Sequence, residues 1–181
     1  MSELVKKYKV APFINTGTTA APVWMRVKKS TSFDLNLNPE TQDFEYIADE
    51  IPTTELLRYK PSLSLPITMY KGEADYDLAF DKFFNLETGT DAKVELMIVF
   101  FMESDSITVD ETEYSGYKAW RTETVLSVQN LNSVDSTITV QADFSGSITR
   151  GVAYKNGENV ITFAEDTSSN SSSDDALTWG S

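Results

Sequence analysis

The chain has 181 residues, of which 40% are hydrophobic and 12% aromatic, and a formal net charge of −13 at pH 7. This length and apolar content predict one domain with a substantial core and exclude a globally disordered chain. The sequence contains neither His nor Cys. It therefore excludes a histidine general base, a Ser-His-Asp triad, thiolate chemistry and disulfides. An enzyme hypothesis is left with carboxylate, lysine or tyrosine chemistry.

Charge is distributed unevenly along the chain. Residues 1–30 contain six Lys/Arg residues and one acidic residue, whereas the remaining 151 residues contain nine basic and 27 acidic residues. An acidic body of this kind repels nucleic acid and anionic membranes. A basic N-terminal segment beside an acidic body suits contact between neighbouring copies of the same chain. Solubility alone is the alternative explanation.

No segment has the features of a membrane span or a signal peptide. The apolar runs are all shorter than the ~20 residues that a transmembrane helix needs. The first ten residues contain lysines but lack the apolar region of a signal peptide. We therefore expect a protein that stays in a cytoplasm, or is assembled there into something larger.

The N-terminal part is predicted to be an irregular arm over residues 1–22, because Pro12, Gly17 and Pro22 interrupt it. The domain is expected to cover residues 23–164. An acidic, Ser/Asp-rich tail is expected to follow over residues 165–181.

The first strands are predicted from alternation of apolar and polar residues. A short strand is expected at 24–28. Residues 33–37 alternate cleanly, and residues 44–48 continue the alternation. We expect these two segments to pair as a hairpin across residues 38–43.

Residues 49–62 are predicted to form a long loop. Two prolines bracket this segment, and neither the helical nor the strand period is sustained in it. Long loops in compact domains are usually functional or disordered. Since this one contains Leu56, Leu57 and Tyr59, we expect it to dock onto something.

The centre of the chain combines the predicted helix with the most apolar strand. The helix is expected at about 75–88, with Asp75 capping its first turn and Gly89 ending it. Its apolar stripe consists of Tyr76, Ala79, Phe80 and Phe83. The strand at 94–102 is apolar on both faces, so both faces should be covered. These features predict a β-sandwich with one helix across it.

Further strands are predicted at 63–69, 117–129, 137–144, 148–154 and 160–163. The first of these precedes the helix and contains Pro66, which predicts an edge or bulged strand. The last two flank an Asn156-Gly157 turn.

Two patterns resemble cation sites. Asp34, Asn36, Asn38 and Glu45 match positions of a calcium-binding loop, but Pro39 replaces the required glycine and the flanks alternate as strands. The acidic connection at 103–116 can gather carboxylates, although a run of like charge is more often a solvated loop. We therefore predict no metal site.

Carbohydrate chemistry remains as an alternative. A carboxylate pair across a sandwich groove can hydrolyse a glycoside, but 28 acidic residues make such a pair a non-specific signal. Sugar binding through Trp24, Trp120 or Trp179 lacks a spacing signature, and core or interface positions are the simpler explanation.

Two segments carry a resemblance to a known family. These are YIADEIPTTELLRYKPSL at 46–63 and MYKGEADYDLAFDKFFNLETG at 69–89, with weaker similarity at 119–151. The chain resembles the major tail (tail tube) proteins of long-tailed, siphovirus-type phages that infect Gram-positive bacteria. The resemblance spans roughly residues 10–165.

The resemblance implies a mainly β fold, a β-sandwich or barrel-like tail tube fold with one helix at about 75–88 and a long loop at about 49–62. It implies that six copies close into a ring around a lumen and that rings stack into the tail tube. It implies a structural virion protein with no enzymatic activity and no cofactor. The alternatives are a tail-terminator or baseplate ring protein of the same fold, or a carbohydrate-binding β-sandwich module.

The resemblance also implies the partners and the location. The chain is expected to contact itself within and between rings, together with tape-measure, tail-terminator and baseplate proteins. DNA is expected to pass through without specific binding, and no membrane is involved. The protein is expected in the virion, after assembly in the cytoplasm of the bacterial host.

Site residues follow in two sets. The loop that reaches a neighbouring subunit or ring is expected to make its contacts through Glu50, Leu56, Leu57, Arg58 and Tyr59. The resemblance does not say which strand face lines the lumen. From alternation, the polar candidates are Asp34, Asn36, Asp43, Glu45, Gln141 and Asp143.

Overall fold

The computed structural model describes residues 4–45, 51–158 and 160–166. Its elements in chain order are η1 (Lys7–Lys9), β1 (Val10–Asn15), β2 (Trp24–Arg26), β3 (Asp34–Asn36), β4 (Pro39–Phe44), β5 (Thr53–Tyr59), β6 (Ser62–Thr68), α1 (Ala74–Asn85), β7 (Lys93–Val109), β8 (Thr112–Asn132), β9 (Thr137–Phe144), β10 (Thr149–Lys155) and β11 (Ile161–Glu165). The fold is mainly β with one α-helix among the described residues, as predicted, and η1 is a single 3₁₀ turn.

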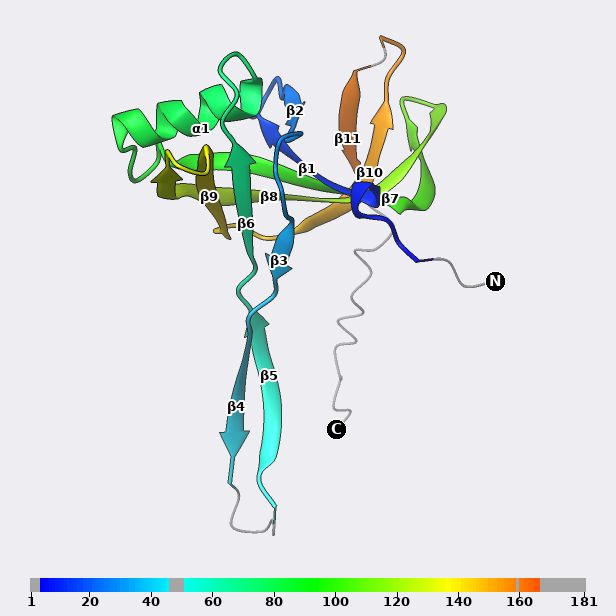
Figure 1. Ribbon diagram of the computed structural model, residues 1–181. Coiled ribbons are helices and arrows are strands. Elements are labelled where there is room, and N and C mark those ends of the chain that lie inside the picture. The colour runs from blue at the N-terminus through cyan, green and yellow to red at the C-terminus, as the bar shows by residue number, and fades with distance from the viewer. Residues whose placement is uncertain (1–3, 46–50, 159, 167–181) are drawn as a thin grey trace, which may run out of the picture.

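Nine of the strands form one antiparallel sheet built around two long strands, β7 and β8 (Figure 1). The strand order is β2-β1-β7-β8-β9-β6-β3, with β10 and β11 added to this path at β8. Along its edge opposite β7, β8 pairs first with β10, over residues 116–121, and then with β9, over residues 124–132. The long strands therefore join two halves of the molecule.

The centre of β7 is buried on both faces, as its sequence predicted. Leu96 and Ile98 belong to one core, which α1 covers through Ala79. Met97 and Val99 face the other side and belong to a second core, against which β11 packs. Each of these four β7 side chains is at most 1% exposed. The predicted sandwich therefore corresponds to these two cores, one on each face of β7.

Strands β6 and β9 close the first core with strict alternation. Leu63, Leu65 and Ile67 point inward from β6. They pair with Ala142, Val140 and Ile138 of β9, which are also buried. The intervening residues of both strands are polar, apart from Pro66, and lie on the outer face.

The helix bounds differ from the prediction at both ends. Helix α1 begins at Ala74 after an N-cap Glu73 that makes no side-chain capping bond, so Asp75 is not the cap. Instead the Asp75 carboxylate is 4% exposed and accepts hydrogen bonds from the backbone N–H groups of Lys28 (3.0 Å) and Lys29 (2.8 Å). The helix ends at Asn85, and its C-cap Leu86 takes the left-handed conformation with a φ of 48°. Gly89 also has a positive φ but lies in the following turn.

We expect Asp75→Ala to lower the free energy of unfolding by about 1–3 kcal/mol, because it leaves two backbone donors without their acceptor. Asp75→Asn retains one acceptor oxygen and should lose less. Urea denaturation of both variants measures the difference. Equal stability of Asp75→Ala and the unmodified chain would show that this tie between the helix and the loop after β2 contributes nothing.

The prediction of an irregular arm over residues 1–22 is wrong for Val10–Asn15, which form β1 between β2 and β7. Phe13 and Ile14 are at most 2% exposed. Pro12 is tolerated because its carbonyl accepts from Val27 N (3.0 Å), just beyond the end of β2. In an antiparallel sheet, the N–H and C=O groups of one residue point to the same neighbouring strand. For Pro12 this neighbour is β2, so the N–H group that proline lacks would lie where the pairing of β1 with β2 ends.

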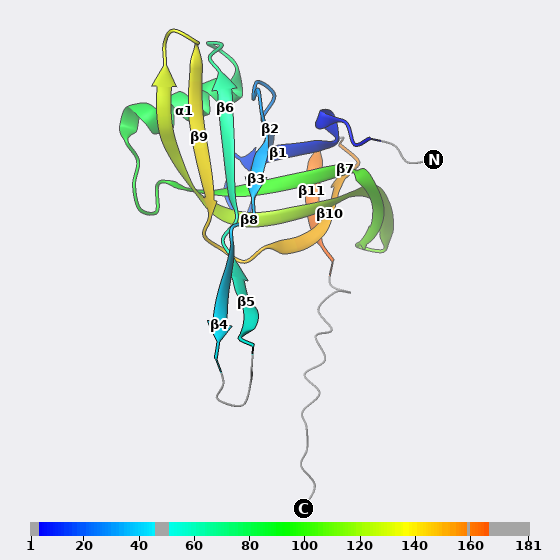
Figure 2. The same ribbon diagram turned by 60° about the horizontal axis from the view of Figure 1, so that its bottom comes forward.

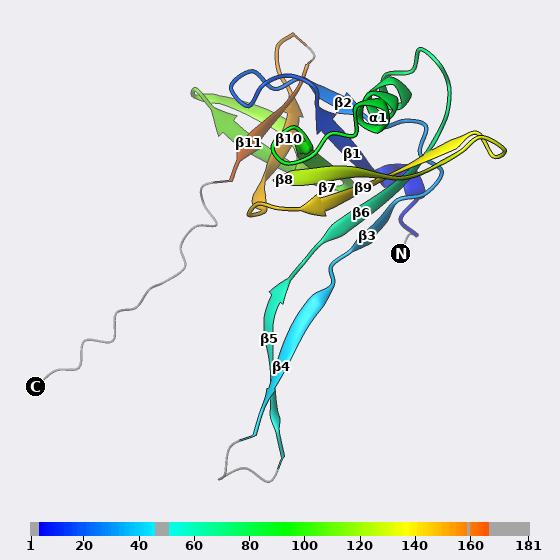
Figure 3. The same cartoon turned by 90° about the vertical axis from the view of Figure 1, so that its left-hand side faces the viewer.

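The predicted loop at 49–62 and the predicted hairpin across 38–43 are also wrong. Strand β3 pairs with β6, and β4 pairs with β5, which occupies residues 53–59. Both pairs belong to one long antiparallel ladder that is interrupted near Asn38, whose φ is 43°. The outer part, β4 and β5, projects from the body as an arm (Figures 1 and 3). Periodicity could not reveal this arm because both of its faces are largely exposed, so neither strand alternates.

Candidate assembly surfaces

The arm presents apolar side chains that the described chain leaves about half exposed. Leu56, Leu57 and Tyr59 of β5 are 50–53% exposed. The pairing shifts register between Glu40 and Thr41, which pair with Arg58 and Leu56, so Leu57 lies in a β-bulge. An exposed strand ladder with leucines is a typical interaction surface.

Charged pairs hold the two strands of the arm together. Glu40 accepts from Arg58 Nε (2.5 Å) and also pairs with Lys60. Hydrogen bonds from Lys60 and then Arg58 lower the pKa of Glu40, so this carboxylate stays ionised at neutral pH. On the same ladder Thr54 donates to Asp43 (2.7 Å). Arg58, a predicted contact to a neighbouring subunit, is thus already paired within its own arm.

The root of the arm is fixed by backbone and side-chain bonds. Lys60 N donates to the carbonyls of Leu37 (3.0 Å) and Asn38 (3.2 Å). The Asn38 side-chain amide donates to the carbonyl of Lys60 (3.0 Å) and to the Ser62 hydroxyl (3.1 Å). The arm therefore leaves the body in a defined direction. Glu50, the remaining predicted contact, lies outside the described residues.

Four of the six lumen candidates share one face of the sheet. Asp34 pairs with Ser64, which pairs with Gln141. One row further, Asn36 pairs with Ser62, which pairs with Asp143. Residues that are directly opposite or two apart point to the same face, so these side chains form one polar surface over β3, β6 and β9. We call this surface the polar face.

The other two lumen candidates lie elsewhere. Asp43 is on β4 and bonds to Thr54, and Glu45 follows the end of β4. Both belong to the arm, which projects away from the body (Figure 2). The sequence-based set therefore mixed two surfaces.

The basic residues that continue the polar face onto β7 and β8 are paired with carboxylates. Lys93 Nζ lies 2.8 Å from Glu123, and hydrogen bonding from Lys93 lowers the pKa of Glu123. Arg121 lies 2.5 Å from Glu95. Asp34 and Asp143 accept hydrogen bonds from Ser32 and Gln141, which leave their negative charge uncompensated. This part of the surface is polar and mildly acidic.

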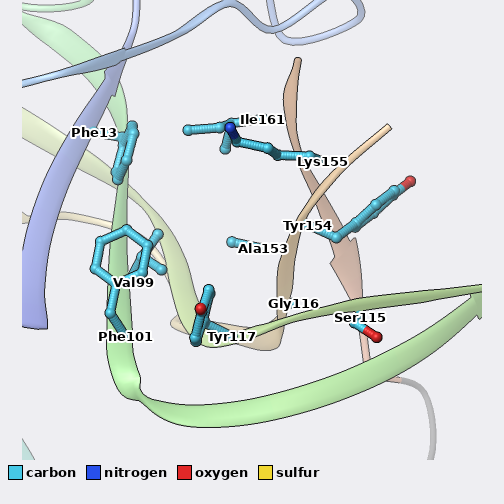
Figure 4. Close-up of a pocket in the computed structure, with 10 residues that line it drawn as sticks. All are labelled: Phe13, Val99, Phe101, Ser115, Gly116, Tyr117, Ala153, Tyr154, Lys155 and Ile161. Atoms are coloured by element: carbon cyan, nitrogen blue, oxygen red, sulfur yellow. The ribbon is translucent and has the colours of Figure 1, made fainter. Parts of the chain in front are cut away.

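A cavity of about 280 Å³ opens beside the second core, between β7, β8 and β10 (Figure 4). Its walls are mainly apolar, with Phe13 and Phe101 on one side and Ile161 on another. Lys155 supplies a cation, and none of the described residues that line the cavity has a carboxylate. Burial raises the pKa of Tyr154, whose ring packs against Tyr114. The lining therefore cannot supply the carboxylate pair of a glycosidase.

The two tryptophans that the structure describes pack against other side chains instead of forming a shared sugar-binding surface. Trp24 is only 9% exposed and lies in the second core. Trp120 packs edge-on against Phe100 at 5.4 Å between ring centroids. Trp179 lies outside the described residues. A core position thus accounts for Trp24, and packing against Phe100 accounts for Trp120.

The cation patterns fold as strands. Asp34 and Asn36 lie on β3 and the acidic connection is a hairpin of β7 and β8, closed by Asp110 and Glu111, both with positive φ. Within the part of the chain that the structure describes, no group of three acidic side chains is arranged to hold a metal ion. Over the same residues, no helix is long and apolar enough to cross a membrane.

Helix α1 carries a surface that the sequence analysis missed. Of the predicted apolar stripe, only Ala79 and the half-buried Tyr76 pack against the first core. Phe80, Phe83 and Phe84 are 38%, 36% and 73% exposed. The sequence carries no separate signal for this exposure, because Phe80, Phe83 and Phe84 have the i, i+3, i+4 spacing of a single apolar stripe.

Comparisons with known proteins reveal the same fold in virus-like tails. No family model and no curated protein matches the sequence. The chain is similar to a chain of the anti-feeding prophage cap, a tube terminating cap, with a TM-score of 0.51 and 10% identity over 84% of this chain and 94% of that chain. It is also similar to a chain of the virion of a native gene transfer agent, with a TM-score of 0.50 and 12% identity over 81% and 98% of the two chains. At these identities the likeness shows the fold, which is tail tube-like.

Proposed function

We propose that the chain is the structural subunit of a siphovirus-type phage tail tube, which assembles into stacked six-membered rings and serves as the conduit for the genome. The observation that carries this proposal is the arm of β4 and β5, on which Leu56, Leu57 and Tyr59 remain half exposed in the described chain. The tail tube-like fold supports it. The chain has no catalytic activity and needs no cofactor in this role.

Ring closure accounts for the edges of the sheet. Strands β2 and β3 end the main strand order and have three residues each. In a closed ring, an edge of one copy pairs with an edge of the next, which satisfies backbone groups that would otherwise invite uncontrolled association. The contact is head-to-tail, since two different surfaces of each subunit meet.

The polar face is the surface that lines the lumen in this proposal. Its Ser, Thr, Asn and Gln side chains offer no fixed positive charge to phosphates, and Asp34 and Asp143 repel them. A duplex therefore slides along this wall without binding. Leu56, Leu57, Arg58 and Tyr59 are assigned to the contact with a neighbouring subunit or ring, together with Glu50.

Replacing the two carboxylates of the polar face with lysines should convert this face into a DNA-binding surface. We expect tubes of the Asp34→Lys, Asp143→Lys variant to retain duplex DNA at low salt and to release it as salt rises, with at least about tenfold more DNA bound than by unmodified tubes. The Glu103→Lys, Glu113→Lys variant, on the hairpin of β7 and β8, reverses the same number of charges and is the control that should leave retention low. Equal retention by all three kinds of tube contradicts the lumen assignment.

The similarity to a tube terminating cap favours one further candidate, a tail-terminator or baseplate ring protein of the same fold. Negative-stain images of assembled protein distinguish the roles. A tube subunit gives hollow tubes of variable length, because each ring offers a surface to the next. A terminator or baseplate protein stops at one or two rings, and that result would replace the tube assignment.

A further inference from the structure

Helix α1 exposes a connected set of aromatic rings, which we call the aromatic face. Tyr76, Phe80, Phe83 and Phe84 form it, with centroids of the contacting rings 5.8–6.1 Å apart. Leu86 at the end of the helix is 76% exposed and extends it. Large exposed apolar groups that cluster in this way mark a surface that another protein covers.

The surroundings of the aromatic face are acidic. Asp77 and Asp81 are exposed on the helix. Its one basic residue, Lys82, pairs with Glu87 and donates to the carbonyl of Asp91, so it does not offset these charges. The occupant of the aromatic face must therefore combine apolar side chains with positive charge.

The N-terminal segment, residues 4–9, has this combination. Leu4, Val5 and Tyr8 are 88%, 54% and 55% exposed. The same six residues include three lysines: Lys6, Lys7 and Lys9. Lys6 and Lys9 lie 6.0 and 5.9 Å from the centre of the Tyr8 ring, and neither is paired with a carboxylate in the ion pairs of the described residues. The segment is thus an apolar and cationic counterpart of the aromatic face.

The two surfaces cannot meet within one chain. Helix α1 lies at one end of the long strands, and η1 with the N-terminal segment lies at the other end (Figures 1 and 2). Surfaces at opposite ends of a subunit meet when copies are placed side by side. This is the head-to-tail geometry that closes a ring.

The arm is a poorer occupant of the aromatic face. It has apolar side chains, but its cations Arg58 and Lys60 are both paired with Glu40. Its other charged residues include Asp43 and Glu55, which repel Asp77 and Asp81. Charge therefore favours the N-terminal segment over the arm as the occupant of the aromatic face, and the arm is expected to contact a different surface.

We propose that residues 4–9 of one copy dock on the aromatic face of α1 in the next copy round the ring. The inference rests on the proposed function, because it needs copies arranged side by side. Leu4, Val5 and Tyr8 pack on the phenylalanines of the neighbour, while the lysines meet Asp77 and Asp81. Each copy supplies one segment and one helix, so a closed ring leaves neither surface exposed.

A charge exchange tests the contact. The first variant carries Lys6→Glu and Lys7→Glu, and the second carries Asp77→Lys and Asp81→Lys. Each should raise the protein concentration needed for assembly by about tenfold or more, because like charges then face each other. A chain carrying all four substitutions should assemble at the concentration of the unmodified protein.

A matched control separates this contact from an effect of net charge. Its chain combines Lys6→Glu and Lys7→Glu with Glu103→Lys and Glu113→Lys, which are exposed on the hairpin of β7 and β8. It has the same net charge as the fourfold variant and should remain defective. Phe84→Asp, at a site 73% exposed, should also block assembly and leave the monomer folded by circular dichroism.

The outcomes distinguish this inference from the function on which it rests. Assembly of the first variant at the unmodified concentration, failure of the fourfold variant to recover, or recovery of the control would each overturn the docking while unmodified tubes still form. If the unmodified protein forms neither rings nor tubes, the proposed function and the docking both fall.

Discussion

Leu57→Asp is expected to abolish tube formation and to leave the subunit soluble and folded. Leu57 is 53% exposed in the bulge of the arm, so an aspartate there costs little in the monomer, within about 0.5 kcal/mol of unfolding free energy. At an interface the same change buries a carboxylate without a partner, which costs several kcal/mol. Sedimentation of assembled protein, with circular dichroism of the supernatant, measures both quantities.

Val134→Asp is the control for this variant. Val134 is 90% exposed in the turn between β8 and β9, so the chemical change is similar and the arm is untouched. It should assemble as the unmodified protein does. Tubes formed by Leu57→Asp in normal yield would remove the arm from the set of assembly contacts.

Leu65→Ala is expected to lower the free energy of unfolding by about 2–5 kcal/mol. Leu65 is 0% exposed at the centre of β6, where the first core is closed on both sides, so a cavity left there has few ways to collapse. Ser64→Ala, the neighbouring residue on the outer face, should change it by less than about 0.5 kcal/mol.

The measurement needs a background in which assembly does not contribute to stability, because association stabilises whatever it binds. Urea denaturation in the Leu57→Asp chain provides one. Equal midpoints for the Leu65→Ala and Ser64→Ala variants would contradict the placement of Leu65 in the core.

The core of this fold could be predicted because its residues obey the local rules. The strand at 94–102 is apolar on both faces, and both are buried in β7. The alternation at 137–144 is that of β9, with Ile138, Val140 and Ala142 inward. Burial imposes these patterns, so a pattern of this kind predicts burial in return.

The mispredicted segments are those in which the sequence pattern of apolar and polar residues does not report burial or strand pairing. The arm has no buried face, so no period distinguishes β5 from a loop. Strand β1 contains Pro12, which usually argues against an interior strand, and the register with β2 makes it tolerable.

The residues of the candidate assembly surfaces could be predicted only in part, because their grouping depends on strand pairing and on what covers each surface. Asp34, Asn36, Gln141 and Asp143 share a face only because β3 and β9 both pair with β6 in a particular register, and no single strand contains that information. The aromatic face was misjudged because helical periodicity identifies an apolar stripe but not what covers it. In this chain Phe84 lies on the outside.

Light scattering coupled to size exclusion tests the central claim, self-assembly into rings and tubes, most directly. Purified protein is injected over a range of concentrations, with and without a tape-measure protein, and the early fractions are imaged by negative stain. We predict a species of at least six subunits that yields hollow rings or tubes. A mass of one subunit, 20.2 kDa, at every concentration and with the added partner would contradict the tube assignment.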